Sequence, residues 1–246
     1  MKHIDLRLFA GENDVFETAY HQVVSKVDMF VVVECLRAFG GKMLEAPCFT
    51  HSSLPKVRHI VLDDVPGTNR RERQHALRQS ATEWIPGGTG PEDIVCFGDC
   101  DEIAHEETWD KAEAILAEHP EVTVAGYLEE RQFFANWEVP GVVNRRLKFV
   151  RGRKFNEQGM HALRWSEDNT VIERAGWHLA YCGGPWPYAV KADRYGRTRP
   201  NDALQTWWGH VRNRRAVDGQ VINTQGLWPT AINARHHLTE TLLYFP

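Results

Sequence analysis

The acidic triplet Asp99-Cys100-Asp101 carries the clearest chemical signal in the sequence. One residue separates the two aspartates, so in an extended chain both carboxylates point to the same side. Two hard oxygen donors at this spacing suit Mn²⁺ or Mg²⁺, with water and phosphate oxygens in the other coordination positions. A metal that bridges a diphosphate neutralises the charge that builds up as the diphosphate leaves. The triplet therefore predicts a metal site that holds a diphosphate.

The triplet is one of three places where acidic residues follow a predicted strand. Three apolar runs end at Val33, Leu62 and Phe97, and acidic residues follow each of them directly or after one glycine. Ligands of open α/β sheets bind beyond the carboxyl ends of the strands, so we expect the cavity at this edge. The acids at the three strand ends are Glu34, Asp63, Asp64, Asp99, Asp101 and Glu102.

A second informative segment is Gly176-Trp177-His178-Leu179-Ala180-Tyr181-Cys182-Gly183-Gly184. His178 offers an imidazole that can ligate a metal, although a hydrogen-bonded core histidine is the alternative. Gly183 and Gly184 would let the backbone approach a phosphate or a sugar closely.

The elements that must position these residues alternate between strand and helix over the first 120 residues. This alternation predicts an α/β fold with a mainly parallel sheet flanked by helices. We expect strands over 4–10, 29–33, 57–62 and 94–97, and a long strand or hairpin over 122–137. We expect helices from Asn13 or Asp14, from Asn69 with Glu72 at a capping-box spacing, and near 106–119.

The second part of the chain differs in pattern and charge. Beyond about residue 140 the pattern becomes irregular, and the prolines at 185, 187 and 200 argue against long helices, apart from a final helix over about 201–214. Residues 1–139 have a net charge of −12, residues 140–215 a net charge of +9, and seven of the nine tryptophans lie at or after Trp137. We therefore predict a single domain over 1–246, with an acidic nucleotide-sugar half (1–139) and a basic, Trp-rich acceptor half (140–246). Mutual neutralisation of the two halves across their contact is the alternative.

The sequence also bears on location. No apolar run approaches the roughly 20 residues that span a bilayer, and the N-terminus has no signal-peptide pattern. We expect a cytoplasmic protein without a membrane anchor, in a bacterium or a virus-infected cell, with its five cysteines reduced.

Four segments resemble glycosyltransferase family 17, the group of the β-1,4-mannosyl-glycoprotein N-acetylglucosaminyltransferases. The likeness extends over about residues 1–195 and keeps the order and rough spacing of the family's segments. The matching segments are 9–17 (FAGENDVFE), 27–34 with 39–42 (VDMFVVVE and FGGK), 98–103 (GDCDEI) and 176–184 (GWHLAYCGG).

The resemblance implies a GT-A fold, a UDP-sugar donor, a divalent metal and inversion at the anomeric carbon. It makes Asp99 and Asp101 the pair that holds the metal and the ribose diphosphate, and it adds His178 to the metal site. Besides Asp99, the resemblance suggests five donor-binding residues, which are Glu12, Glu34, Lys42, Arg78 and Lys191. We add Gly183 and Gly184 as donor-binding residues.

The chain also departs from the family. The animal members have a membrane anchor and a stem, and their His-x-Glu after the lysine is replaced here by Asp193-Arg194-Tyr195. These differences leave the acceptor open between a glycan and a hydroxymethylated base in phage-type DNA. An inverting transfer also needs a base for the acceptor hydroxyl, and the candidates are Glu129, Glu130 and Glu102.

Three other hypotheses fit parts of the sequence. A metal-dependent nuclease or phosphohydrolase would use the strand-end acids but leaves 176–184 unexplained. A zinc site would need Cys96, Cys100, His105 and Cys182, which lack the usual CxxC spacing. A nucleic-acid-binding module would use the basic clusters at 145–146, 151–154 and 212–215 among the tryptophans.

Overall fold

The structure is a computed structural model that describes residues 1–135, 137–195 and 200–213. Its strands are β1 (His3–Phe9), β2 (Met29–Cys35), β3 (Val57–Leu62), β4 (Ile94–Asp99), β5 (Glu102–Ala104), β6 (Val124–Gln132), β7 (Glu138–Arg151) and β8 (Thr170–Ala180). Its helices are α1 (Asn13–Val23), α2 (Arg70–Gln79), α3 (Glu106–Glu118), α4 (Gly152–Trp165), α5 (Pro185–Arg194) and α6 (Pro200–Asn213), with a 3₁₀ turn over Ser80–Trp84.

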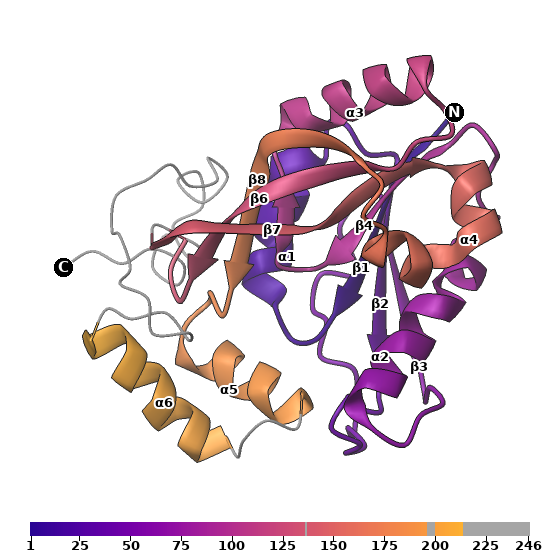
Figure 1. Cartoon of the computed structure of the whole chain (residues 1–246). Coiled ribbons are helices and arrows are strands. Elements are labelled where there is room, and N and C mark those ends of the chain that lie inside the picture. The colour runs from indigo at the N-terminus through magenta and orange to yellow at the C-terminus, as the bar shows by residue number, and fades with distance from the viewer. Residues whose placement is uncertain (136, 196–199, 214–246) are drawn as a thin grey trace.

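The strands form one curled sheet in the order β3-β2-β1-β4-β7-β6-β8-β5 (Figure 1). The first four strands of this order are parallel, so their carboxyl ends lie at one edge. β7 pairs antiparallel with both β4 and β6, β8 pairs parallel with β6, and the short β5 closes the sheet antiparallel to β8. The predicted α/β class and the mainly parallel, helix-flanked sheet are confirmed.

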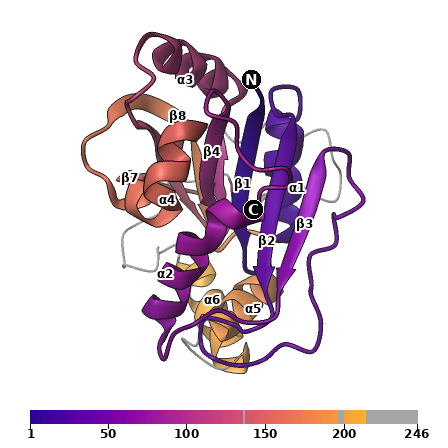
Figure 2. The ribbon, with the colours of Figure 1, turned by 90° about the vertical axis from the view of Figure 1, so that its right-hand side faces the viewer.

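Helices cover both faces of the sheet and bury its apolar side chains. On one face, Phe16 of α1 and Trp109 of α3 pack against Phe30, Val32 and Phe149 of the strands. On the other face, α2, the 3₁₀ turn and α4 pack against the opposite side chains of β1, β2 and β4. Figure 2 shows the parallel strands between α2 and α4 on one side and α1 on the other. This arrangement explains why the apolar runs of β2 and β4 show no alternation.

The capping residues in the sequence predicted the start of α2 correctly and the start of α1 to within one residue. Asn69 is the N-cap of α2, and its side chain accepts a hydrogen bond from the Glu72 amide at 3.1 Å. α1 begins at Asn13, but its N-cap is Glu12, which makes no side-chain cap. The expectation that Asn13 or Asp14 caps this helix was therefore wrong, and the Glu12 side chain is directed elsewhere.

The expected irregularity beyond residue 140 is wrong for the described range 138–213. This range holds two long strands and three helices, among them the 14-residue β7 and the 14-residue α4, which breaks at Gly159. Two of the prolines mark helix starts, because Pro185 and Pro200 are the first residues of α5 and α6. The predicted final helix over about 201–214 is confirmed as α6, and residues 214–246 lie outside the described part.

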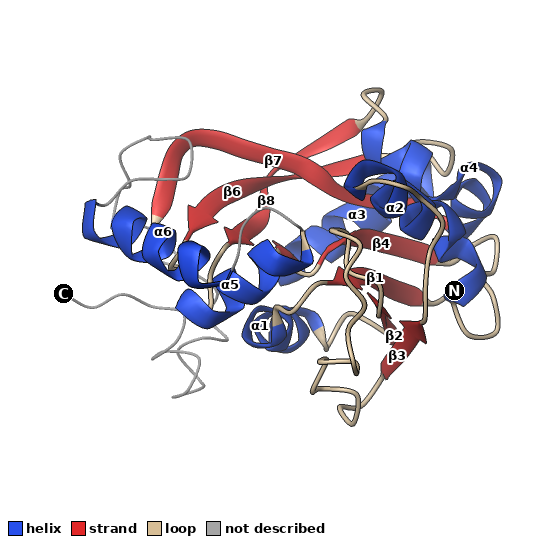
Figure 3. Ribbon diagram, turned by 90° about the horizontal axis from the view of Figure 1, so that it is seen from below, coloured by secondary structure: helices blue, strands red, loops and turns tan. Residues whose placement is uncertain are grey.

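α5 and α6 pack side by side at the end of the β6–β7 hairpin (Figure 3). Tyr188 and Ala192 of α5 and Trp207 of α6 form one apolar cluster with Phe133 and Trp137 of the hairpin. The cluster fixes α5 next to the carboxyl ends of β4 and β8. Within the described residues, no helix is both long enough and apolar enough to cross a membrane.

Candidate active site

A cavity of about 230 Å³ lies where β4 and β8 end and α5 begins. We call it the Asp cavity, because Asp99 and Asp101 both line it. The other side chains that line it come from α2, the end of β8, the turn that follows it, and α5. They are Gln74, His178, Ala180, Tyr181, Tyr188, Lys191, Ala192 and Tyr195.

Asp99 lies at the end of β4 and is held by two guanidinium groups from α2 and α4, which cover the same face of the sheet. An Asp99 carboxylate oxygen lies 3.2 Å from Arg78 Nη2 of α2, and the other lies 2.9 Å from Arg164 Nη2 of α4. Burial acts to raise the pKa of Asp99, but Arg164 and Arg78 outweigh it, so the pKa lies below its ordinary value. Asp99 is therefore ionised. Arg78 contacts Asp99 and does not line the Asp cavity, and its predicted contact with the nucleotide stays a prediction.

Asp101 is buried and makes its contacts on the opposite side, with β8 and α5. Its Oδ2 accepts a short hydrogen bond from Lys191 Nζ and lies 3.5 Å from His178 Nε2. Burial works against ionisation of Asp101, yet the charges of Lys191 and His178 hold its pKa well below the ordinary value. Asp101 is therefore also an anion, balanced by cations of its own.

His178 lies between two carboxylates and links them. Its Nδ1 donates to Glu130 Oε2 at 2.5 Å, while its Nε2 faces Asp101. Burial alone would lower the pKa of His178, but Asp101 and Glu130 outweigh it and raise the pKa well above its ordinary value. The imidazole is thus protonated on both nitrogens in this arrangement. Asn144 Nδ2 of β7 lies 3.1 Å from the same Nδ1.

Glu12 does not line the Asp cavity but pairs with Lys191, which does. Lys191 Nζ lies 2.8 Å from Glu12 Oε1, and Glu12 Oε2 accepts a hydrogen bond from the Ala10 amide at 2.8 Å. Because both oxygens of Glu12 make these contacts, its side chain does not cap α1. Gly183 (φ 98°) and Gly184 (φ 93°) both adopt backbone conformations that favour glycine. They turn the chain from β8 into α5 and so deliver Lys191 to Asp101.

Two predicted donor-binding residues lie away from the Asp cavity. Glu34 is fully buried, accepts backbone hydrogen bonds from Cys48 and Phe49, and pairs with Arg194 at 2.9 Å. The side chain of Lys42 is 63% exposed and pairs with Asp193 at 2.9 Å. The strand-end acids therefore do not all converge.

The remaining strand-end acids also have other partners. Asp64 pairs with Arg37 at 2.6 Å on the surface, outside the Asp cavity. Both oxygens of the buried Glu102 lie 2.8 Å from Arg164, and one of them also accepts from the Asp99 amide at 2.9 Å. Glu102 thus orients Arg164 and the backbone of Asp99 rather than facing a cavity.

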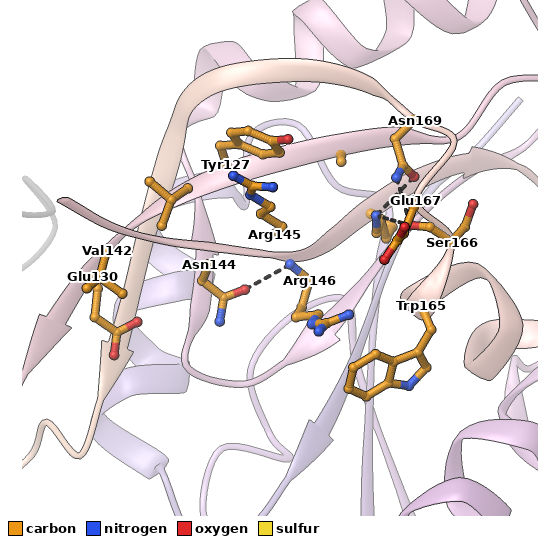
Figure 4. Close-up of a pocket in the computed structure, with 13 residues that line it drawn as sticks. Tyr127, Glu130, Val142, Asn144, Arg145, Arg146, Trp165, Ser166, Glu167 and Asn169 are labelled. Carbon is orange, nitrogen blue, oxygen red and sulfur yellow. Dashed lines mark hydrogen bonds between the residues drawn. The ribbon is translucent and has the colours of Figure 1, made fainter. Parts of the chain in front are cut away.

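The two adjacent glutamates of β6 have different surroundings. Glu129 pairs with Arg131 at 2.7 Å and lies 3.5 Å from Arg174. Glu130 contacts His178 and lines a second cavity of about 700 Å³, which we call the Arg cavity (Figure 4). Other side chains that line the Arg cavity are Ala125, Tyr127, Val142, Val143, Asn144, Arg145, Arg146, Lys148, Trp165, Ser166, Glu167 and Asn169.

Sequence reasoning missed Arg164 and Asn144. Arg164 lies 62 residues beyond Glu102, with no spacing signal between them, so the pairing depends on how α4 returns to the sheet. Asn144 lies on a strand that the sequence pattern did not indicate. Gln74 has a clearer signal, because it lies one turn before Arg78 on the same helix face.

The donor types fit a hard divalent cation, but the present pairing does not offer a finished ligand set. No three His, Cys, Asp or Glu side chains in the described ranges lie grouped as a metal site. A metal at Asp99 and Asp101 would have to take the place of Lys191 at Asp101. The same finding removes the zinc hypothesis for Cys96, Cys100, His105 and Cys182, and all five cysteines are free thiols.

No protein-family model matches the chain, and no curated protein does either. Among solved structures, 4-diphosphocytidyl-2C-methyl-D-erythritol synthase superposes with a TM-score of 0.45 and 13% identity, covering 71% of this chain and 89% of that one. S. aureus TarS superposes with a TM-score of 0.42 and 15% identity, covering 87% of this chain and 40% of TarS. TarS residues 1–349 in complex with UDP give a TM-score of 0.41 and 13% identity, covering 87% and 71% of the two chains. At these values the likenesses carry no conclusion about activity.

Proposed function

We propose that this protein is a metal-dependent, inverting glycosyltransferase of the GT-A type. It transfers a hexosyl or N-acetylhexosaminyl group from a UDP-sugar to a hydroxyl of a glycan or of a hydroxymethylated base in DNA, in the cytoplasm. The observation that carries the proposal is the convergence of Asp99, Asp101 and Lys191 in one cavity at the carboxyl ends of the strands.

The Asp cavity offers each group that a nucleotide diphosphate needs. Asp99 and Asp101, with a neutral His178, would hold Mn²⁺ or Mg²⁺, which when bound supplies a Lewis acid for the diphosphate charge. Lys191 then becomes available as a cation for the leaving phosphate. Arg78 and Arg164 keep Asp99 ionised and oriented. Tyr181, Tyr188 and Tyr195 supply flat surfaces for a base or a sugar.

Glu130 is the best placed of the three candidate bases. It lines the Arg cavity, and its contact with His178 places it beside the Asp cavity. In the transfer, the acceptor oxygen attacks the anomeric carbon and its proton passes to Glu130. The bond between the anomeric carbon and the phosphate oxygen breaks, and its electron pair leaves with UDP. Because attack and departure occur on opposite faces, the anomeric configuration inverts.

Release of UDP from a panel of UDP-sugars, with and without Mn²⁺, tests the proposal. We expect one donor to be hydrolysed slowly, faster with Mn²⁺, and Asp101→Asn to abolish the metal stimulation. Asp193→Asn is the matched control, since Asp193 pairs with Lys42 at 2.9 Å and does not line the Asp cavity. Failure to turn over any nucleotide sugar, together with metal-dependent cleavage of DNA, would instead establish the nuclease alternative.

A further inference from the structure

The Arg cavity lies on the far side of His178 from the Asp cavity. It is formed by β6, β7 and the segment that follows α4 (Figure 4). Tyr127 and Glu130 are three residues apart on β6 and would point to opposite faces of a regular strand. The register of β6 is irregular between Gly126 and Leu128, and both side chains line the cavity. Its volume of about 700 Å³ falls within the roughly 300–1,000 Å³ of pockets that hold small ligands.

Two arginines of the Arg cavity are held by aromatic rings. The Arg146 guanidinium lies 3.7 Å from the ring centroid of Trp165, and the Arg145 guanidinium lies 4.8 Å from that of Tyr127. Neither arginine forms an ion pair with a carboxylate among the residues that the structure describes. Stacking fixes the planes of the guanidinium groups and leaves their N–H edges for a planar or tetrahedral anion.

Lys148 adds a buried cation to the same wall. The residue is 2% exposed, and its Nζ donates to Asn169 Oδ1 at 2.9 Å and to the Ser166 carbonyl at 3.2 Å. An ammonium has three donors, so one remains for a ligand in the cavity. The acids that line the cavity are Glu167 and Glu130, and His178 already balances Glu130. The cavity is therefore net positive.

Two other arginines of the basic part of the chain are buried and have partners inside the protein. Arg151 donates to the carbonyls of Leu116 and Glu92, and Arg194 pairs with the buried Glu34. These two buried arginines are therefore not part of an exposed basic surface of the kind that tracks a nucleic-acid backbone. The Arg cavity instead gathers Arg145, Arg146 and Lys148 around a space of small-ligand size, which favours a compact anionic ligand.

The Arg cavity is also positioned for chemistry at the donor. Glu130 lines the Arg cavity and contacts His178, which lines the Asp cavity. Asn144 also lines the Arg cavity, and its Nδ2 lies 3.1 Å from His178 Nδ1. A hydroxyl held near Glu130 would therefore face the sugar of a donor bound at Asp99 and Asp101.

We propose that the Arg cavity is the acceptor site and that it takes a saccharide bearing an anionic group, a phosphate or a carboxylate. Arg145, Arg146 and Lys148 bind the anion, and the ring hydroxyl to be glycosylated points toward Glu130. This inference rests on the proposed function for its role in transfer, although the anion site itself does not.

Calorimetric titrations of the full chain with glucose, glucose 6-phosphate and glucuronate test the site. We expect both acidic sugars to bind at least about tenfold more tightly than glucose, as charge-assisted hydrogen bonds require. Arg146→Ser and Arg145→Ser should each weaken the acidic sugars by about tenfold and leave glucose unchanged. Arg153→Ser is the matched control, because Arg153 is 68% exposed, pairs with Glu92 and lies outside the cavity.

Two results would overturn the inference. One is equal affinity for glucose and the acidic sugars. The other is tight, steeply salt-dependent binding of an oligonucleotide that Arg153→Ser weakens as much as Arg146→Ser, which would indicate an extended nucleic-acid surface.

Titration of the same variants with UDP separates this inference from the proposed function. UDP binding that survives Arg146→Ser while glucuronate binding is lost supports two separate subsites. Absence of UDP binding in the unmodified chain, with glucuronate still bound, contradicts the transferase and leaves the anion site. UDP binding without discrimination among the sugars contradicts the acceptor site and leaves the transferase.

Discussion

At the scale of single residues, the site is built from shared charges. His178 serves two carboxylates, Lys191 serves two, and Asp99 is served by two arginines. No ionised group of this network acts alone, so a substitution removes the partner of a buried charge as well as a side chain. Predictions at this scale therefore need control variants that remove the same chemical group from a different environment.

Glu130→Gln tests the assignment of the base. We expect the rate constant for transfer to fall by about 100-fold or more, as loss of a general base does, with little change in the KM for the donor. Glu129→Gln is the matched control, because its neighbour Arg131 directs Glu129 away from both cavities. Steady-state kinetics of both variants decide between them, and a larger loss in Glu129→Gln would contradict the assignment.

Lys148 should give anion binding a dependence on pH. Burial lowers the pKa of Lys148 to about 8, with Arg146 and Arg164 acting in the same direction and Glu102 against them. Below this pH the ammonium binds the anion, and above it the neutral amine does not. The affinity for glucuronate, which stays ionised, should therefore fall as the pH rises through about 8.

Titrations with glucuronate on both sides of that pH provide the measurement. Lys148→Met should bind weakly throughout and lose the pH dependence. A constant affinity of the unmodified chain across this range would show that Lys148 does not contact the ligand.

At the scale of elements, two glycines leave space that the site uses, one for backbone and one for a side chain. A Cβ on Gly176 of β8 would lie 1.9 Å from the Ile103 carbonyl oxygen of β5, so the two strands pair only with glycine there. A Cβ on Gly98 would lie 2.6 Å from a Glu102 oxygen, the same oxygen that receives the Asp99 amide. Glycine at 176 thus permits the pairing of β5 with β8, and glycine at 98 leaves room for the Glu102 carboxylate beside Asp99.

Gly176→Ala should therefore be strongly destabilising. We expect the free energy of unfolding to fall by about 3 kcal/mol or more, since backbone must move to admit the methyl group, and activity to fall with it. Gly209→Ala on α6 is the opposite case, because nothing lies within 4 Å of the added Cβ. It should raise the free energy of unfolding by up to about 1 kcal/mol. Urea unfolding measures whether the free energy of unfolding falls in Gly176→Ala and rises in Gly209→Ala.

The sequence predicted the elements whose pattern lies within a few neighbouring residues, and it missed those that depend on distant contacts. β3 has the bounds expected for 57–62, and α2 starts where Asn69 and Glu72 indicate. β7 was missed because Pro140, Gly141 and the polar run over 144–146 interrupt its apolar residues. Arg164 was missed for a different reason, since its partners Asp99 and Glu102 are brought to it by topology alone.

At the scale of the whole molecule, the acidic and basic parts of the chain meet through buried ion pairs. Arg164 joins Asp99 and Glu102, Lys191 joins Asp101, and Arg194 joins Glu34. This is the mutual neutralisation that the charge asymmetry allowed as an alternative. The strand-end acids predicted a cation at that edge, and in the described structure arginine and lysine side chains fill that place.

These pairs make stability depend on pH. Burial acts to raise the pKa of Glu34, but hydrogen bonds from Cys48 and Arg194 outweigh it, so the folded-state pKa is lowered. A lowered carboxyl pKa contributes stability above the unfolded value of about 4.3, and this contribution is lost as the pH falls through the folded value. The free energy of unfolding should therefore drop below about pH 4.

Urea unfolding over a pH series measures this dependence. Glu34→Gln should be less stable at neutral pH, because Arg194 keeps a buried charge without its partner, and its stability should change less on acidification. If the free energy of unfolding changes with pH equally in the variant and the unmodified chain, Glu34 does not cause the pH dependence.

The attachment of Asp99 and Asp101 to three helices has a consequence for how this protein can evolve. Arg78 belongs to α2, Arg164 to α4 and Lys191 to α5, so the two carboxylates connect the sheet to three helices through ion pairs. In many enzymes, neutral replacements of site residues make the protein more stable as they make it less active. Here Asp99→Asn should lower both quantities. Selection for heat resistance alone would then retain these aspartates, even in a lineage that no longer used the activity.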